Sequence, residues 1–99
     1  MVKTESDLQR QCIDWLRREH PAVYARKIIV ANRAGTPDLL MCIRGRFVAI
    51  EFKTEGGKQT ALQKYNEQQI KQAGGKYSIV MNLEKFKSEI EKWQKENIK

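Results

Sequence analysis

The chain has few of the residues that build zinc clusters, disulfide frameworks or membrane spans. Its 99 residues include two cysteines, one histidine and two prolines, and no apolar run approaches 18 residues. Cys12 and Cys42 are far apart, and neither belongs to a metal-spaced pair, which argues against a zinc site and favours reduced thiols. The first residues also lack a signal-peptide pattern, so we expect a cytoplasmic protein without membrane contact.

Acidic residues are fewer than basic ones. The sequence has 19 Lys and Arg against 12 Asp and Glu, a net charge of +7, which indicates a polyanionic partner such as DNA. The lysines near the C-terminus alternate with acids, as on a solvated helix surface. We therefore take eight other basic residues as candidate phosphate contacts: Arg26, Lys27, Arg33, Arg44, Arg46, Lys58, Lys64 and Lys71.

The length allows one domain, 1–99, with one modest core. Apolar periodicity and turn residues predict a helix, three strands, a helix, a strand and a last helix. The expected ranges are 4–19, 23–30, 38–43, 47–53, 60–73, 76–81 and a final helix capped by Asn82. The crossover through the second helix makes the third and fourth strands parallel, which predicts an α/β fold with a mixed four-stranded sheet flanked by helices.

Two acids stand at equal distances from a predicted hairpin turn. With Arg44-Gly45 as the turn, residue 43 faces 46, and counting outward brings Asp38 opposite Glu51. Directly opposed residues have Cβ atoms roughly 4.5–5.5 Å apart, a distance at which two carboxylates repel each other. A fold keeps this arrangement most readily when a cation lies between the two acids.

Lys53 lies two residues beyond Glu51, so it projects from the same strand face as both acids. Two carboxylates with a nearby ammonium suit metal-assisted hydrolysis of a phosphodiester. The alternative is that Asp38 closes a turn begun by Pro37, and that Glu51 and Lys53 belong to a solvated face. Apolar residues on the acid face argue against this alternative, because unpaired charge beside them is costly.

Two other polar residues have both structural and functional explanations. At 100° per residue, Glu5 lies within about 40° of the centre of the first helix's apolar face, so it is expected to point toward the sheet. Its alternative role is that of a first-turn acid favoured by the helix dipole. Gln63 follows Thr60 with the spacing of a capping box, which explains it without any catalytic role.

The spelling Gly35-x-Pro37-Asp38, followed by Glu51-x-Lys53 on the next strand, resembles the PD-(D/E)XK nuclease superfamily and within it the VRR-NUC branch. An acid early in the first helix and a Gln on the second helix fit the same pattern. The resemblance implies a restriction-endonuclease-like core and Mg²⁺ or Mn²⁺ as cofactor. It implies metal binding by Glu5, Asp38, Glu51 and the Phe52 carbonyl, a water-activating role for Lys53, and site positions for Gln63 and Gln9.

The sequence shows no recognition helix, zinc finger or run of stacking aromatics, which favours recognition of DNA shape over base readout. Small relatives of this kind resemble dimeric Holliday-junction resolvases, so we expect a homodimer that cuts four-way junctions, and a phage or mobile-element origin suits the resemblance. The alternatives are a flap or nicking nuclease and a nucleic-acid-binding module that has lost catalysis. The Phe86, Ile90 and Trp93 stripe and the sheet-edge strand are the candidate dimer surfaces.

Overall fold

The computed structural model describes residues 3–96 and contains the predicted order of elements. The elements are α1 (Glu5–Glu19), β1 (Tyr24–Lys27), β2 (Leu39–Ile43), β3 (Arg46–Phe52), α2 (Ala61–Gln72), β4 (Lys76–Val80) and α3 (Leu83–Lys95). Thr4, Thr60 and Asn82 cap the three helices by accepting main-chain N–H bonds. The order and the mixed α/β architecture are therefore confirmed.

The sheet has the order β1-β2-β3-β4, with β1, β2 and β3 antiparallel and β4 parallel to β3. Ile43 pairs with Arg46, and the register continues outward to Leu39 and Ile50, as counted from the turn. Arg44 and Gly45 both have positive φ angles, 52° and 82°, which suits the tight turn of a hairpin. The hairpin register is confirmed.

The first strand is shorter than predicted. It ends at Lys27, and only the Ile28 N–H extends the pairing, with a 2.8 Å bond to the Asp38 carbonyl. Ile29 and Val30 are exposed, because the chain leaves the sheet before reaching them and enters the loop that leads to Asp38. The prediction was too long because Ile29 and Val30 have high β-propensity, although the structure leaves both side chains exposed.

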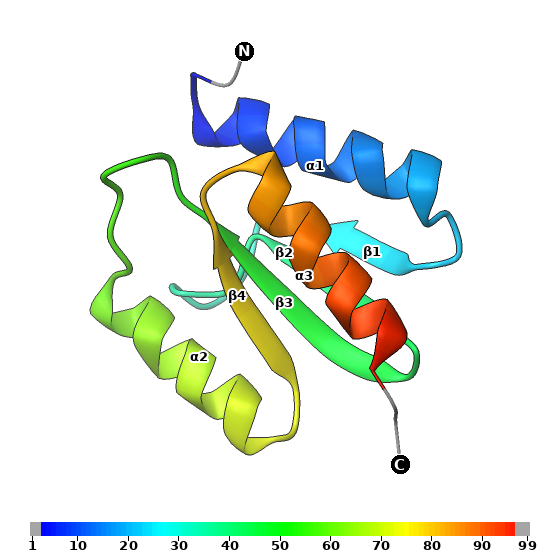
Figure 1. The fold of residues 1–99 in the computed structure, drawn as a ribbon. Coiled ribbons are helices and arrows are strands. Elements are labelled where there is room, and N and C mark those ends of the chain that lie inside the picture. Colours follow the sequence, from blue (N-terminus) through cyan, green and yellow to red (C-terminus); the bar gives the residue numbers. More distant parts are fainter. Residues whose placement is uncertain (1–2, 97–99) are drawn as a thin grey trace.

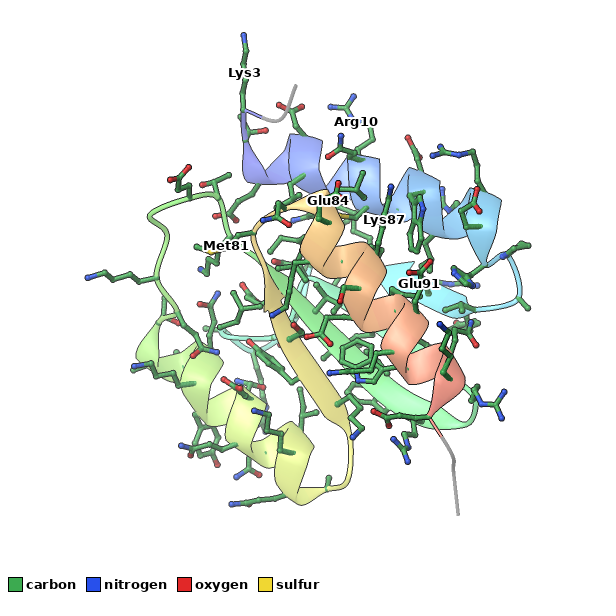
Figure 2. The ribbon with its side chains drawn as sticks, in the orientation of Figure 1. Lys3, Arg10, Met81, Glu84, Lys87 and Glu91 are labelled. Carbon is green, nitrogen blue, oxygen red and sulfur yellow. The ribbon has the colours of Figure 1, made fainter. Side chains whose placement is uncertain are left out.

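The core lies between one face of the sheet and the helices α1 and α3, which both cover that face and diverge from each other along it (Figure 1). Phe86, Ile90 and Trp93 of α3 are all buried there. The prediction that this stripe forms a dimer surface is therefore wrong, because the stripe packs α3 onto the sheet of its own chain. The outward face of α3 carries Glu84, Lys87 and Glu91 instead, a mixture of charges that suits contact with water (Figure 2).

The opposite face of the sheet is covered only in part. Helix α2 packs chiefly against β4, and none of its residues is fully buried. Over β1 and β2, the side chains of Tyr24 and Cys42 remain exposed, as does Phe47 at the start of β3. Within residues 3–96, no helix is long and apolar enough to cross a membrane.

Candidate active site

Asp38 is fixed by the main chain of its neighbours. Its N–H donates to the Ile50 carbonyl at 3.1 Å, and its carboxylate Oδ2 accepts the Phe52 N–H at 2.8 Å. The loop before it depends on Gly35, which has a φ of 84° and lies so close to α2 that an added Cβ would be 2.8 Å from main-chain atoms of Leu62. The Gly-x-Pro-Asp segment thus places the Asp38 carboxylate beside the last residue of β3.

Glu51 is a nearly buried acid beside Asp38, with only 2% of its surface exposed. Its Oε2 accepts a hydrogen bond of 2.5 Å from Gln63 Nε2 and lies 3.9 Å from Lys53 Nζ. Its other oxygen, Oε1, is buried without a hydrogen-bond partner among the described residues. Burial, and next the charge of Asp38, raise the pKa of Glu51 to about 7, while Lys53 opposes the rise.

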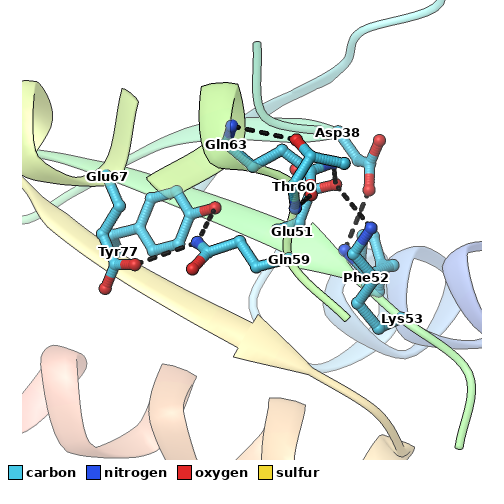
Figure 3. Close-up of polar contacts among 9 residues, drawn as sticks. All are labelled: Asp38, Glu51, Phe52, Lys53, Gln59, Thr60, Gln63, Glu67 and Tyr77. Atoms are coloured by element: carbon cyan, nitrogen blue, oxygen red, sulfur yellow. Dashed lines mark hydrogen bonds and ion pairs between the residues drawn. The ribbon is translucent and has the colours of Figure 1, made fainter. Parts of the chain in front are cut away.

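Gln63 connects the start of α2 to the acid pair. Its Oε1 accepts the Thr60 N–H at 2.8 Å in a complete capping box, while its Nε2 donates to Glu51 (Figure 3). One amide therefore caps α2 and contacts Glu51 at the same time. Lys53 approaches from the end of β3, where its N–H bonds to the Val80 carbonyl at 3.0 Å. The Gln63 amide and the Lys53 ammonium consequently both approach the same oxygen of Glu51, Oε2.

A second polar network supports α2 behind this site and was not anticipated from the sequence. Gln59 Nε2 donates to Glu67 Oε1 at 2.9 Å and to the Tyr77 hydroxyl at 3.2 Å (Figure 3). Glu67 also accepts a bond from Lys71 at 2.7 Å. Burial is the main cause that raises the pKa of Tyr77 to about 12, and the charge of Glu51 adds to it. The network ties the loop before α2 to both α2 and β4.

No family model matches the sequence, and no curated protein is significantly similar to it. Two solved structures do match the fold. One, titled "VRR_NUC domain", superposes with a TM-score of 0.74 at 23% identity, over 90% of this chain and 97% of that one. The other, titled "VRR_NUC domain protein", superposes with a TM-score of 0.80 at 20% identity, over 94% of this chain and 89% of that one. The chain has the fold of a VRR_NUC domain.

Glu5 does not point into the VRR_NUC core as its helical position predicted. It is the first residue of α1 and is exposed, although it is close enough to add a small upward effect on the pKa of Glu51. Within residues 3–96, no three His, Cys, Asp or Glu side chains come together closely enough to hold a metal ion. Asp38 and Glu51 are thus brought together, and Glu5 stands apart. Gln9, one turn further along α1, has a buried Oε1 without a described hydrogen-bond partner.

The eight basic candidates are distributed over the whole VRR_NUC fold. Arg44 and Arg46 lie at the turn of the hairpin, which is the opposite end of β2 and β3 from the acid pair. Arg46 is ion-paired with Glu96, and Lys71 with Glu67. Arg44, Arg46 and Lys71 therefore do not surround the acid pair. The other five lie on β1, on the loops before β2 and α2, and on α2: Arg26, Lys27, Arg33, Lys58 and Lys64.

Proposed function

We propose that this chain is an endonuclease that hydrolyses DNA phosphodiester bonds with Mg²⁺ or Mn²⁺. The observation that carries the proposal is the buried carboxylate of Glu51, which faces a second acid and whose Oε1 has no hydrogen-bond partner within residues 3–96. Burying a charged, unsatisfied oxygen beside another carboxylate is costly unless a cation neutralises both. Hard divalent ions prefer such oxygen donors.

The residues fit a divalent ion. Asp38, Glu51 and the main-chain carbonyl of Phe52 would hold it, and the exposed Glu5 at the start of α1 would join them as a further carboxylate only by turning toward the bound ion. When bound, such an ion lowers the pKa of a coordinated water and polarises the phosphate. Lys53 supplies the fixed positive charge, since its ammonium lies 3.9 Å from Glu51 and is mostly buried. It orients the attacking water and stabilises negative charge that develops on the phosphate.

The neighbouring hydrogen bonds keep these groups in place. Gln63 holds one oxygen of Glu51, which leaves the other directed away from the amide, and the Phe52 N–H holds one oxygen of Asp38. Neither acid has to reorganise before reaction, a property that favours catalysis by preorganised charge. A module that only binds DNA has no use for two carboxylates near phosphate, because they repel it.

Our proposed substrate is the four-way DNA junction, cut by a homodimer. Each small chain offers one site, and a two-fold dimer places two sites in the symmetry of such a junction. The net charge of +7 favours a polyanion with closely spaced phosphates. Flap cleavage or single nicking by a monomer is the second candidate, supported by the same acid pair and by the small size of the chain.

The experiment is a parallel digestion of labelled four-way junctions, flaps, nicked duplex and linear duplex in Mg²⁺. Light scattering at micromolar concentration gives the mass in solution. Paired symmetric nicks confined to the junction, made by a dimer, support the resolvase. A monomer that prefers flaps or single-stranded ends refutes the resolvase and keeps the nuclease. Binding without cleavage of any substrate, in either metal, refutes the nuclease.

A further inference from the structure

The sheet face that carries the acid pair continues as an apolar floor toward the hairpin turn. On β3, Phe47 and Ala49 share the face of Glu51, and on β2, Leu40 and Cys42 follow Asp38 on the same side. A hollow of about 330 Å³ opens here. It is lined by Tyr24, Arg26, Leu40, Met41, Cys42 and Phe47.

Two aromatic rings stand in one row across this floor. Tyr24 pairs with Cys42, which pairs with Phe47, so the rings flank the cysteine from the first and third strands. Both rings are open to solvent, with 56% of Tyr24 and 46% of Phe47 exposed. Exposed rings on the strands of an open sheet are a surface on which unpaired nucleobases stack.

The charge of the hollow suits a nucleic acid. Its single charged side chain is Arg26, whose guanidinium lies 4.1 Å from the centre of the Tyr24 ring and donates to the Ala25 carbonyl at 2.8 Å. An arginine held against a tyrosine adds a second stacking plane and a positive charge beside the ring. The positive charge of Arg26, on a chain with a net charge of +7, attracts the phosphates of a DNA strand.

The hollow lies within reach of a strand bound at the acid pair. From Glu51 to Phe47 are four residues of one strand, which span about 13 Å at roughly 3.3 Å per residue. Stacked DNA advances 3.4 Å per nucleotide along one strand. A base within about four nucleotides of the bond to be cut therefore reaches the rings, provided that it is not paired.

We propose that this hollow is a subsite for an unpaired nucleobase of the substrate strand, which stacks on Tyr24 and Phe47 beside Arg26. The inference rests on the proposed nuclease function, because the acid pair defines which strand lies there. Branched DNA offers bases that unstack easily, whereas an uninterrupted duplex does not. The subsite thus gives the enzyme a preference for DNA with unpaired nucleotides next to the cut, without reading their identity.

The test uses Tyr24→Ala, with Tyr65→Ala as its matched control. Tyr65 is a tyrosine of nearly the same exposure, 57% against 56%, which lies on α2 outside the lining of the hollow. Binding is measured in EDTA with a single-stranded oligonucleotide that carries 2-aminopurine, and with the duplex of the same sequence. We expect Tyr24→Ala to weaken single-strand binding roughly tenfold and to abolish quenching of the probe. Tyr24→Ala should leave duplex binding unchanged, and Tyr65→Ala should bind both DNAs and quench the probe as wild type does. Tyr24→Trp should restore the quenching.

A second measurement replaces single nucleotides of the cut strand by abasic sites. Wild type should lose affinity at one position within about four nucleotides of the cut, and Tyr24→Ala should lose that dependence. Equal losses for both tyrosine variants, or none for Tyr24→Ala, overturn the subsite. So does a Tyr24→Ala protein that changes from dimer to monomer, because the hollow then belongs to a second copy. Since the binding assay needs no cleavage, an inactive chain with Tyr24-dependent quenching refutes the nuclease alone.

Discussion

Replacement of Glu51 by glutamine should change how the stability of the metal-free protein depends on pH. The pKa of Glu51 is raised from 4.5 to about 7 in the fold, so the folded state keeps a proton that the unfolded chain releases. The stabilisation from this group is complete below pH 4.5 and is lost as the pH rises to about 7. At 1.36 kcal/mol per pKa unit, the loss amounts to about 3 kcal/mol.

Glutamine keeps the size of the side chain and an acceptor for Gln63, but it cannot ionise. The Glu51→Gln protein should therefore gain stability relative to wild type as the pH rises, by up to about 3 kcal/mol, with no further gain well above pH 7. The assay is urea unfolding at several pH values between 4.5 and 8, in EDTA, which removes any stabilising cation. Glu55→Gln, an exposed acid in the loop after β3, is the control and should run parallel to wild type.

The physical cause can be separated from a general charge effect by adding Mg²⁺ or Mn²⁺ at pH 8. A cation at the acid pair should raise the stability of wild type and leave Glu51→Gln nearly unchanged, because a ligand that binds only the folded state stabilises it. Parallel pH curves for wild type and Glu51→Gln in EDTA would show that Glu51 carries no buried charge. The reasoning from its burial would then be refuted.

Asp38→Ala and Lys53→Ala should each abolish cleavage while DNA binding and the fold remain, since groups that act as a unit give single losses as large as the combined one. Activity within about threefold of wild type removes that residue from the mechanism. Glu5→Gln should weaken metal affinity in a titration more than it changes stability; an unchanged midpoint leaves Glu5 with its helix-dipole role. Gln59→Glu places a carboxylate against Glu67 and so weakens the support of α2, which should lower the maximal cleavage rate more than DNA affinity. The double variant Gln59→Glu with Glu67→Gln exchanges donor and acceptor and should restore the rate. If the double variant is as slow as Gln59→Glu alone, the Gln59–Glu67 hydrogen bond does not support the site in this way.

Local patterns predicted the hairpin well. Arg44-Gly45 determines the turn, and a turn of known length sets the register of both strands that it joins, so the approach of Asp38 to Glu51 followed by counting. The capping box of Gln63 was visible for the same reason, since its bonds span only three residues. Its bond to Glu51 joins two elements, and the sequence suggested it only through the family resemblance.

Contacts between distant elements could not be predicted in this way. Gln59 is one of many glutamines, and its partners Glu67 and Tyr77 become apparent only once α2 lies against β4. Tyr24 and Phe47 are distant in sequence and form a row only through pairing of both strands with β2. The stripe on α3 was recognised as apolar, but the periodicity of a helix does not tell whether its own sheet or another chain covers it.

Cleavage of a four-way junction by wild type in Mg²⁺, compared with the same reaction in excess EDTA and with Glu51→Gln in Mg²⁺, tests the central claim most directly. A hydrolytic site built on the acid pair and Lys53 predicts strand cuts in Mg²⁺, none in EDTA and none by the variant. Ca²⁺ should support binding of the junction without turnover, because its larger and looser shell positions water poorly. Full cleavage in EDTA, or cleavage by Glu51→Gln within about threefold of wild type, would contradict the claim.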